Sequence, residues 1–377
     1  MKIGLNLLHA RPEIGGVWNY ISRLISTLGD YDDKNEYTAF VTSKSKSIVP
    51  NKLNFQVVKV NIPSVQTYRV IYENSILQYW ARLYDLDLMH WFANVHALIN
   101  LVPSIVTVYD LLVYEKNDYF GIMHKIYLKY MMAYTYKTCK HLLPMSNITA
   151  QKINHILDVP YTQMVVIPAI IDEIFQPKPV IDVKNFRIKY KLPDIFWLYV
   201  AHFYPHKNHL RLLKSYYYLK SNEFSPWPLV LRGDDHGSLQ EIKRAIVSLG
   251  LEKNVHWLPQ LDEIEMPILF STANGLIFPS LYEGGGIPVL EAMACGCPVI
   301  ASDIPAVRES GGNAVSLFDP LDVLSISDSI KKFQGNNTDQ LKAAQRGLDI
   351  VKSHRPRVIA KKIINAYSNC SPRRQGV

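Results

Sequence analysis

The chain has 377 residues, of which 48% are hydrophobic and 20% are charged, so it is long enough for two globular domains and too apolar to be disordered. Its 41 Lys and Arg residues outnumber its 33 Asp and Glu residues, and the last 27 residues hold seven of these bases and no acid. A basic segment of this kind is typical of contact with nucleic acid, of contact with an anionic membrane surface, or of simple solubility. Because no helix-turn-helix, RNA-binding or zinc-finger pattern accompanies it, we expect no nucleic-acid partner.

The N-terminal sequence and the cysteines indicate a cytoplasmic protein. No run of 18 apolar residues predicts a spanning helix, and the first residues lack the apolar length and cleavage signal of a secretory peptide. The four cysteines are too few for a disulfide framework. Cys295-Gly296-Cys297 has no neighbouring His or Cys cluster that would favour zinc, so we expect no metal site.

Strand-like and helix-like runs alternate along the first 170 residues. Helical periodicity covers three stretches, and Ser146 caps a further helix. The expected strands are residues 2–8, 37–42, 55–60, 86–91, 104–108 and 141–145, and the three helical stretches are 17–28, 70–83 and 119–141. This alternation predicts an α/β fold with a doubly wound parallel sheet.

Candidate ligand contacts stand where the predicted strands of this half end. Gly15 and Gly16 lie between a strand and a helix, a turn that either receives an anion or only reverses the chain. His90, Tyr109 and Asp110 close two later strands. Because ligands of doubly wound sheets gather at the carboxyl ends of strands, we take these three as candidates.

The helix expected at 119–141 combines tyrosines with lysines. Four lysines punctuate its apolar sequence, namely Lys125, Lys129, Lys137 and Lys140. Aromatic rings and lysines suit a membrane interface, where they lie among headgroups. The pattern favours a core helix with a solvated lysine face slightly over strong membrane binding, and a weak membrane contact stays open.

The second half repeats the alternation after a stretch marked by prolines at 168, 177, 179 and 193. We therefore expect domains at 1–170 and 180–352, helices at 339–352 and 358–368, and a disordered tail at 371–377. Lys207 lies in a turn between a strand and a helix, where its point charge can meet a pyrophosphate.

The stretch Phe278–Ile300 carries the most specific pattern. Gly284, Gly285 and Gly286 lie between a strand and a helix that begins near Ile287, so backbone amides and the helix dipole favour an anion there. Glu283 and Glu291 flank the glycines, and the second carboxylate could accept paired hydrogen bonds from a ribose diol. Together they predict a nucleotide-sugar site. The alternative is a surface Glu and an unrelated solvated helix Glu.

This arrangement resembles the Glu-x7-Glu element of the retaining GT-B glycosyltransferases, in the large family usually numbered four. The resemblance covers nearly the whole chain and is strongest over 196–320. It implies two Rossmann-like domains facing across a cleft, with the N-terminal, acceptor-binding one completed by a C-terminal helix at about 355–370. It also implies that Glu283 faces the donor sugar and that Glu291 holds the ribose.

The resemblance assigns further residues and shows two departures. It implies that the loop of Gly15 and Gly16 closes over the donor phosphates and that the turn containing Leu261 contacts the nucleobase. Lys207 matches the family's pattern, whereas His202 stands in place of its Arg and Tyr109 in place of a His near the donor sugar. Tyr109 is thus a catalytic candidate beside Glu283 and Lys207, and His90 and Asp110 fall on the acceptor side.

The implied activity is retaining transfer of a hexosyl group from a nucleotide-sugar, with GDP-mannose as first choice, to a glycan or lipid-linked glycan in surface polysaccharide synthesis. UDP-hexoses and dTDP-rhamnose stay open.

We expect neither a metal nor another cofactor, because amides and Lys207 can neutralise the leaving diphosphate. We also expect weak contact with an anionic membrane through helix 119–141 and the basic C-terminal end, which would form one face. The alternatives are an epimerase or hydrolase of sugar nucleotides and a non-catalytic binding protein. The sequence predicts no oligomeric state.

Overall fold

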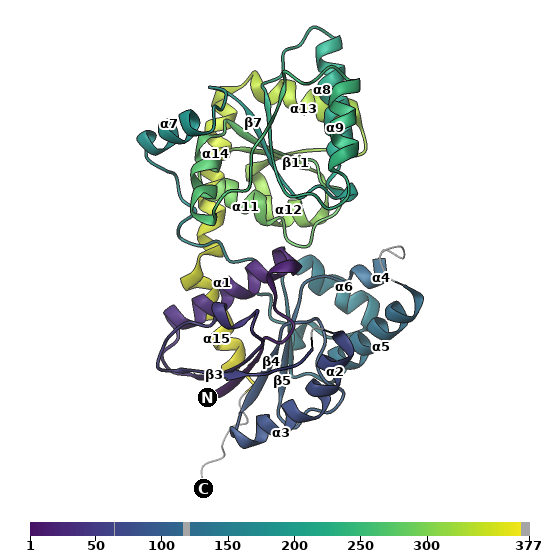
Figure 1. The fold of residues 1–377 in the computed structure, drawn as a ribbon, viewed down its shortest axis with the longest axis vertical. Helices are drawn as coiled ribbons and strands as arrows, with labels where there is room; N and C mark the ends of the chain where they lie inside the picture. The colour runs from purple at the N-terminus through teal and green to yellow at the C-terminus, as the bar shows by residue number, and fades with distance from the viewer. Residues whose placement is uncertain (64, 116–120, 371–377) are drawn as a thin grey trace. The chain divides into compact units, whose positions relative to one another are not determined.

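The computed structural model describes residues 1–63, 65–115 and 121–370, so the tail expected at 371–377 lies outside the described residues. The chain divides into two compact units (Figure 1). The first unit comprises residues 1–170 and the C-terminal helix α15 (Pro356–Ser368), and the second comprises residues 171–355. Each unit is built on a six-stranded parallel sheet with intervening helices, which confirms the predicted α/β, doubly wound architecture.

The sheet of the first unit has the strand order β3-β2-β1-β4-β5-β6. Its strands are β1 (Lys2–Asn6), β2 (Glu36–Val41), β3 (Phe55–Lys59), β4 (Leu88–Trp91), β5 (Ser104–Val108) and β6 (His141–Pro144). The chain leaves β1 toward β2 and β3 and returns to β4 on the opposite side of β1. The strand order therefore reverses between β1 and β4, which is the topological switch point where such sheets bind ligands.

The helices of the first unit depart from prediction at 70–83 and at the short helix Leu112–Glu115, which was not predicted. They are α1 (Gly16–Tyr31), α2 (Gln66–Asn74), α3 (Ile76–Leu83), α4 (Leu112–Glu115), α5 (Ile122–Thr138), α6 (Asn147–Leu157) and α15. The single helix predicted for 70–83 is wrong, because the chain breaks at Ser75 into α2 and α3. There the Asn74 and Ser75 side chains donate to the carbonyls of Val70 and Ile71, at 2.8 and 2.6 Å. Such local bonds compete with a continuous helix.

Helices α5 and α15 cover opposite faces of this sheet. His90 of β4 bonds to Tyr367 of α15, which packs beside α1. The neighbouring strand residues Met89 and Trp91 belong instead to a core cluster with residues of α3 and α5. Because successive strand residues point to opposite faces, α5 and α15 lie on different sides. Helix α15 therefore does not form the predicted joint basic face with α5, while the basic residues of 371–377 lie outside the described part of the chain.

The sheet of the second unit has the order β12-β11-β10-β7-β8-β9, so its switch point lies between β7 and β10. The strands are β7 (Trp197–Val200), β8 (Leu229–Arg232), β9 (Val255–Trp257), β10 (Gly275–Phe278), β11 (Val299–Ser302) and β12 (Val315–Phe318). The helices are α7 (Val180–Lys189), α8 (His209–Ser221), α9 (Leu239–Ser248), α10 (Met266–Thr272), α11 (Ile287–Ala294), α12 (Pro305–Gly311), α13 (Val323–Gln334) and α14 (Asn337–Val351).

Candidate functional site

Two loops of the second unit meet at its switch point, one after β7 and one after β10. The N–H of Leu281 donates to the carbonyl of His206 at 2.8 Å. The Asn208 amide donates to the carbonyls of Pro279 and Pro320, at 3.0 and 2.8 Å, from a backbone with φ of 62°. Asn is among the few residues that adopt this left-handed conformation readily. These bonds hold the two loops against each other.

Lys207 and Glu283 form an ion pair between these loops. The Lys207 Nζ lies 2.6 Å from the Glu283 Oε1, and the side chains are only 16% and 11% exposed. The hydroxyl of Tyr199 donates to the Lys207 carbonyl at 2.6 Å and holds the backbone there. The structure thus brings together two predicted site residues that lie 76 positions apart in the sequence. Removing one partner of such a shielded pair strongly destabilises the protein, because the other charge is left buried and unpaired.

The glycine turn beside Glu283 leaves its amides available. Gly286 has φ of 61°, and a Cβ there would lie 2.5 Å from the Ser310 Oγ, so both conformation and space require glycine. Among the described residues, none accepts a hydrogen bond from the N–H groups of Gly284, Gly285 or Gly286. Helix α11 starts directly after them. The turn therefore points unpaired donors and a helix N-terminus toward any bound anion.

The other predicted donor residues have distinct surroundings. Ile287 is half-buried at the start of α11, and Glu291 is 9% exposed one turn further on. Leu261 follows β9 and has a buried side chain, which leaves its backbone as the part that could contact a base. Their roles toward a donor stay predictions.

His202 is a neutral side chain in a network that includes an unforeseen cation. Its Nδ1 accepts a hydrogen bond from the Asp234 N–H at 3.2 Å. Burial lowers the pKa of His202, as do His236, Arg232 and Lys207, while Asp234 opposes them. Arg232 ends β8 with a side chain 13% exposed and 3.9 Å from the Asp234 carboxylate. Our sequence analysis missed Arg232, although a cation closing a strand before Gly233-Asp234 was the available signal.

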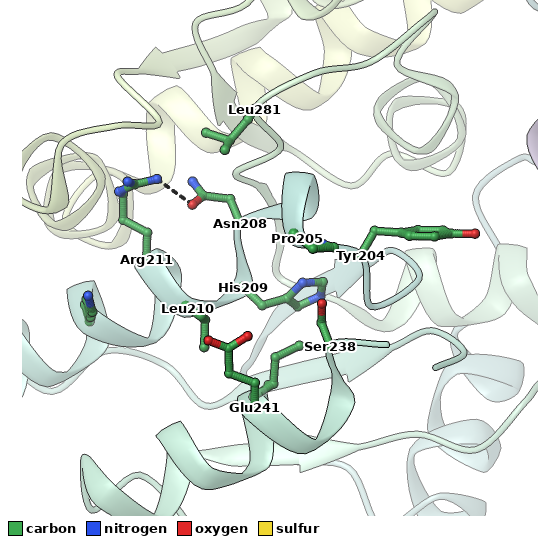
Figure 2. Close-up of a pocket in the computed structure, with 11 residues that line it drawn as sticks. Tyr204, Pro205, Asn208, His209, Leu210, Arg211, Ser238, Glu241 and Leu281 are labelled. Atoms are coloured by element: carbon green, nitrogen blue, oxygen red, sulfur yellow. Dashed lines mark hydrogen bonds between the residues drawn. The ribbon is translucent and has the colours of Figure 1, made fainter. Parts of the chain in front are cut away.

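A separate cavity of about 370 Å³ lies between α8 and α9 (Figure 2). None of the predicted donor-binding residues lines it. His209 lines this cavity, and its ring centroid lies 4.6 Å from that of Tyr199 and 5.0 Å from that of Phe203. Burial lowers its pKa to about 3, and neither ring nitrogen has a hydrogen-bond partner among the described residues. His209 is therefore a neutral core ring.

Two candidates of the first unit are structural, which corrects our predictions. His90 is fully buried, its Nδ1 and Nε2 each 2.8 Å from the hydroxyls of Tyr367 and Thr107. Tyr109 is 6% exposed, and its hydroxyl donates to the Phe92 carbonyl at 3.0 Å. Neither side chain has a polar atom available for a substrate.

The remaining candidates of this unit belong to turns. Asp110 accepts a hydrogen bond from the Leu112 N–H at 3.0 Å, which caps α4. Gly15 has φ of 58° and leads into α1, whose first residue is Gly16. A Cβ on either glycine would meet no neighbouring atom within 4 Å. The turn is therefore open, and its predicted role toward phosphate stays a prediction.

A cavity of about 420 Å³ opens at the switch point of the first unit. It is lined by segments that follow β1, β2, β3 and β4 and by α2 and α5. Among the described residues, no three His, Cys, Asp or Glu side chains are grouped to hold a metal ion. No described helix has the length and apolar character needed to cross a bilayer.

Comparisons with known proteins agree with this geometry. Residues 182–350 match the family model of glycosyl transferases group 1. The chain is 25% identical to O-antigen chain mannosyltransferase B of Escherichia coli, over 80% of this chain and 79% of that protein. It is 28% identical to O-antigen chain mannosyltransferase RfbU of Salmonella typhimurium strain LT2, over 85% of this chain and 87% of that one.

Among solved structures, the Anabaena protein Alr3699/HepE in complex with UDP and glucose superposes with a TM-score of 0.77. The two are 17% identical, and the match covers 98% of this chain and 99% of that one. At this identity the likeness establishes the fold, which is the predicted GT-B fold.

Proposed function

We propose that the chain is a retaining, metal-independent hexosyltransferase of surface polysaccharide synthesis, and the match of residues 182–350 to the glycosyl transferases group 1 model supports this proposal. The observation that carries the proposal is the Lys207–Glu283 pair beside the open amides of Gly284–Gly286. All of these groups stand at the β7/β10 switch point. A cation, unpaired backbone amides and a carboxylate are groups that suit a sugar diphosphate.

The donor diphosphate binds to the glycine amides and to Lys207. Lys207 is neutralised by Glu283 in the free protein, so the incoming phosphate competes with that carboxylate. Because His202 is neutral, it supplies hydrogen bonding but little charge. Arg232, close to Asp234 in the same loop cluster, provides a second cation in place of the family's missing Arg. These charges stabilise the leaving diphosphate without a metal ion.

Glu283 acts on the sugar once Lys207 turns to the phosphate. A released carboxylate next to the anomeric carbon stabilises the positive charge that develops there as the glycosidic bond breaks. Glu291 binds the ribose, as the Glu-x7-Glu resemblance implies. Retention of configuration rests on the same resemblance.

GDP-mannose is the proposed donor, because both O-antigen relatives are named mannosyltransferases. UDP-hexoses are the second candidate, since HepE was solved with UDP and glucose. A thermal-shift panel of GDP, UDP and dTDP separates them. GDP should raise the melting temperature most, and stabilisation by UDP alone would overturn the choice of base. The same panel run with EDTA tests whether metal is needed.

The proposed acceptor is a growing surface glycan on a lipid carrier, and we therefore propose that the protein makes weak contact with an anionic membrane surface. Helix α5 supports this, because it exposes Ile122, Met123, Ile126 and Tyr130 along one side. Co-sedimentation with anionic vesicles should succeed at 0.1 M salt and weaken at 1 M, as the screening length falls from about 10 to about 3 Å. Lack of binding at both salt concentrations would indicate a soluble enzyme acting on a soluble acceptor.

A further inference from the structure

The cavity between α8 and α9 lies where both helices begin. Its volume is about 370 Å³, and it is lined by residues 208–211 at the start of α8 and by Glu241 and Ile242 at the start of α9. The N-terminal end of a helix carries partial positive charge. Two such ends beside one cavity therefore favour an anion there.

Two cations of α8 line this cavity against one carboxylate, that of the exposed Glu241. The Nη1 of Arg211 donates to the Asn208 Oδ1 at 2.7 Å and to the Pro320 carbonyl at 3.3 Å. Its Nε and Nη2 have no hydrogen-bond partner in the described part of the chain, and Lys214 is exposed and forms no ion pair there. The cavity thus has unused cationic donors and one net positive charge, which suits a phosphate.

Ser238 adds a buried hydroxyl to the lining (Figure 2). It lies directly before α9 and is only 6% exposed. Asp235, not Ser238, accepts a hydrogen bond from the N–H of Leu239 at the start of that helix, at 3.2 Å. Within the described residues, the Ser238 Oγ has no hydrogen-bond partner. Because buried hydroxyls are normally hydrogen-bonded, this one indicates a place for a polar group of a ligand.

The rest of the lining suits the ring of a monosaccharide. Pro205, Leu210 and Leu281 supply apolar surface for the C–H groups of a sugar. The Glu241 carboxylate and the Ser238 hydroxyl can bond to sugar hydroxyls. The volume falls at the lower end of the range for small-molecule sites and exceeds what a bare phosphate needs.

We propose that this cavity binds a phosphorylated monosaccharide as an effector of the neighbouring donor site. The phosphate contacts Arg211 and Lys214 near the start of α8. The sugar hydroxyls bond to Ser238 and Glu241 of the α9 side.

The cavity shares part of its wall with the loops of the donor site. Asn208 and Leu281 line it, and both also form the hydrogen bonds that join the loops after β7 and β10. A ligand held against them stabilises the loop arrangement that places Lys207 and Glu283. It should therefore raise nucleotide affinity, and a nucleotide should raise the ligand's affinity by the same factor. This coupling rests on the proposed function, whereas the cavity site does not.

Titration calorimetry with mannose 6-phosphate tests the site without any activity assay. Lys214→Gln should weaken binding by about tenfold, since hydrogen bonds between charged groups are the strong ones. Lys243→Gln is the matched control, because it removes an exposed cation of α9 that does not line the cavity. It should leave the affinity unchanged. Parental affinity in Lys214→Gln would overturn the proposal.

Inorganic phosphate and unphosphorylated mannose separate the two parts of the ligand. Each should bind more weakly than mannose 6-phosphate. Glu241→Ala should weaken binding of mannose 6-phosphate but not of inorganic phosphate, because the lost carboxylate bonds to the sugar and repels the phosphate. Inorganic phosphate binding as tightly as mannose 6-phosphate would overturn the assignment to a sugar, and mannose binding as tightly would overturn the assignment to a phosphate.

Lys207→Ala distinguishes this cavity from the donor site. The affinity for mannose 6-phosphate should be retained in this variant, and its loss there but not in Lys214→Gln would overturn the proposal. In the parental protein, saturating mannose 6-phosphate should lower the Kd of GDP by about fivefold or more, and an unchanged Kd would overturn the coupling. Failure of every nucleotide to bind would refute the proposed function, while the mannose 6-phosphate titrations would still decide the cavity site.

Discussion

The two units share a topology but place different chemistry at their switch points. Between β7 and β10, hydrogen-bonded loops hold a shielded Lys–Glu pair beside glycine amides. Between β1 and β4, a cavity of about 420 Å³ is lined by Arg11, Lys44 and Arg69, of which Lys44 is paired with Glu13. The sheet determines where a ligand binds, and the loop residues determine which ligand. The first arrangement is the one to which our proposed function assigns the donor diphosphate.

The largest expected effect comes from Glu283→Gln. Removing the carboxylate should lower kcat by about a hundredfold or more, because its charge matters most in the transition state. The same change frees Lys207 from its partner, so donor affinity should stay equal or rise. Steady-state kinetics with GDP-mannose and a nucleotide titration measure the two effects. A parental kcat would make Glu283 a bystander.

Lys207→Ala should weaken nucleotide binding more than it lowers turnover. Loss of a charge-assisted contact worth roughly 1.5–3 kcal/mol corresponds to about a tenfold to hundredfold weaker nucleotide affinity. Stability should also fall, since Glu283 is left shielded without its cation. Calorimetric titration with GDP is the measurement. Unchanged affinity would remove Lys207 from the donor site.

Replacing one buried histidine in each unit tests how much its hydrogen bonds contribute to stability. His90→Phe should destabilise the protein by about 1–3 kcal/mol, because the hydroxyls of Tyr367 and Thr107 lose their partner. His209→Phe should be nearly neutral or stabilising, since its ring nitrogens have no hydrogen-bond partner among the described residues. Urea unfolding of the two variants decides. Equal losses would mean that hydrogen bonding does not distinguish these sites.

Both histidines also predict acid sensitivity. The imidazole pKa is 6.5 when unfolded and falls to about 3 in the folded protein for His90 and His209. The unfolded chain therefore binds the extra proton, so this contribution to stability is complete above pH 6.5 and is lost as pH falls toward 3. His209→Phe should flatten the decline between these values. An unchanged pH profile would contradict the assignment of a neutral folded ring.

The smallest effect concerns two glycines at corresponding strand-to-helix turns. Gly286→Ala should cost roughly 1–2 kcal/mol, because its φ is 61° and a Cβ would contact Ser310. Gly16→Ala should be neutral or slightly stabilising, since Gly16 is helical and a Cβ meets nothing within 4 Å. Thermal unfolding gives both values, and a larger loss for Gly16→Ala would reverse the comparison.

The sequence predicted the second unit better than the first for a physical reason. Lys207, Glu283 and the glycines are defined by local patterns at strand ends, and parallel topology brings such ends together. His90 also closes a strand, yet Tyr367, 277 positions later, seals it in the core. No local pattern reveals that contact.

The most direct test of the donor assignment is acceptor-dependent release of GDP from GDP-mannose by the purified protein in EDTA. We expect release when a lipid-linked glycan acceptor is added, little release without it, and background release from Glu283→Gln in either case. Release that is equally fast without any acceptor would indicate a hydrolase. Release that stops in EDTA would contradict charge neutralisation by Lys207 and the Gly284–Gly286 amides alone.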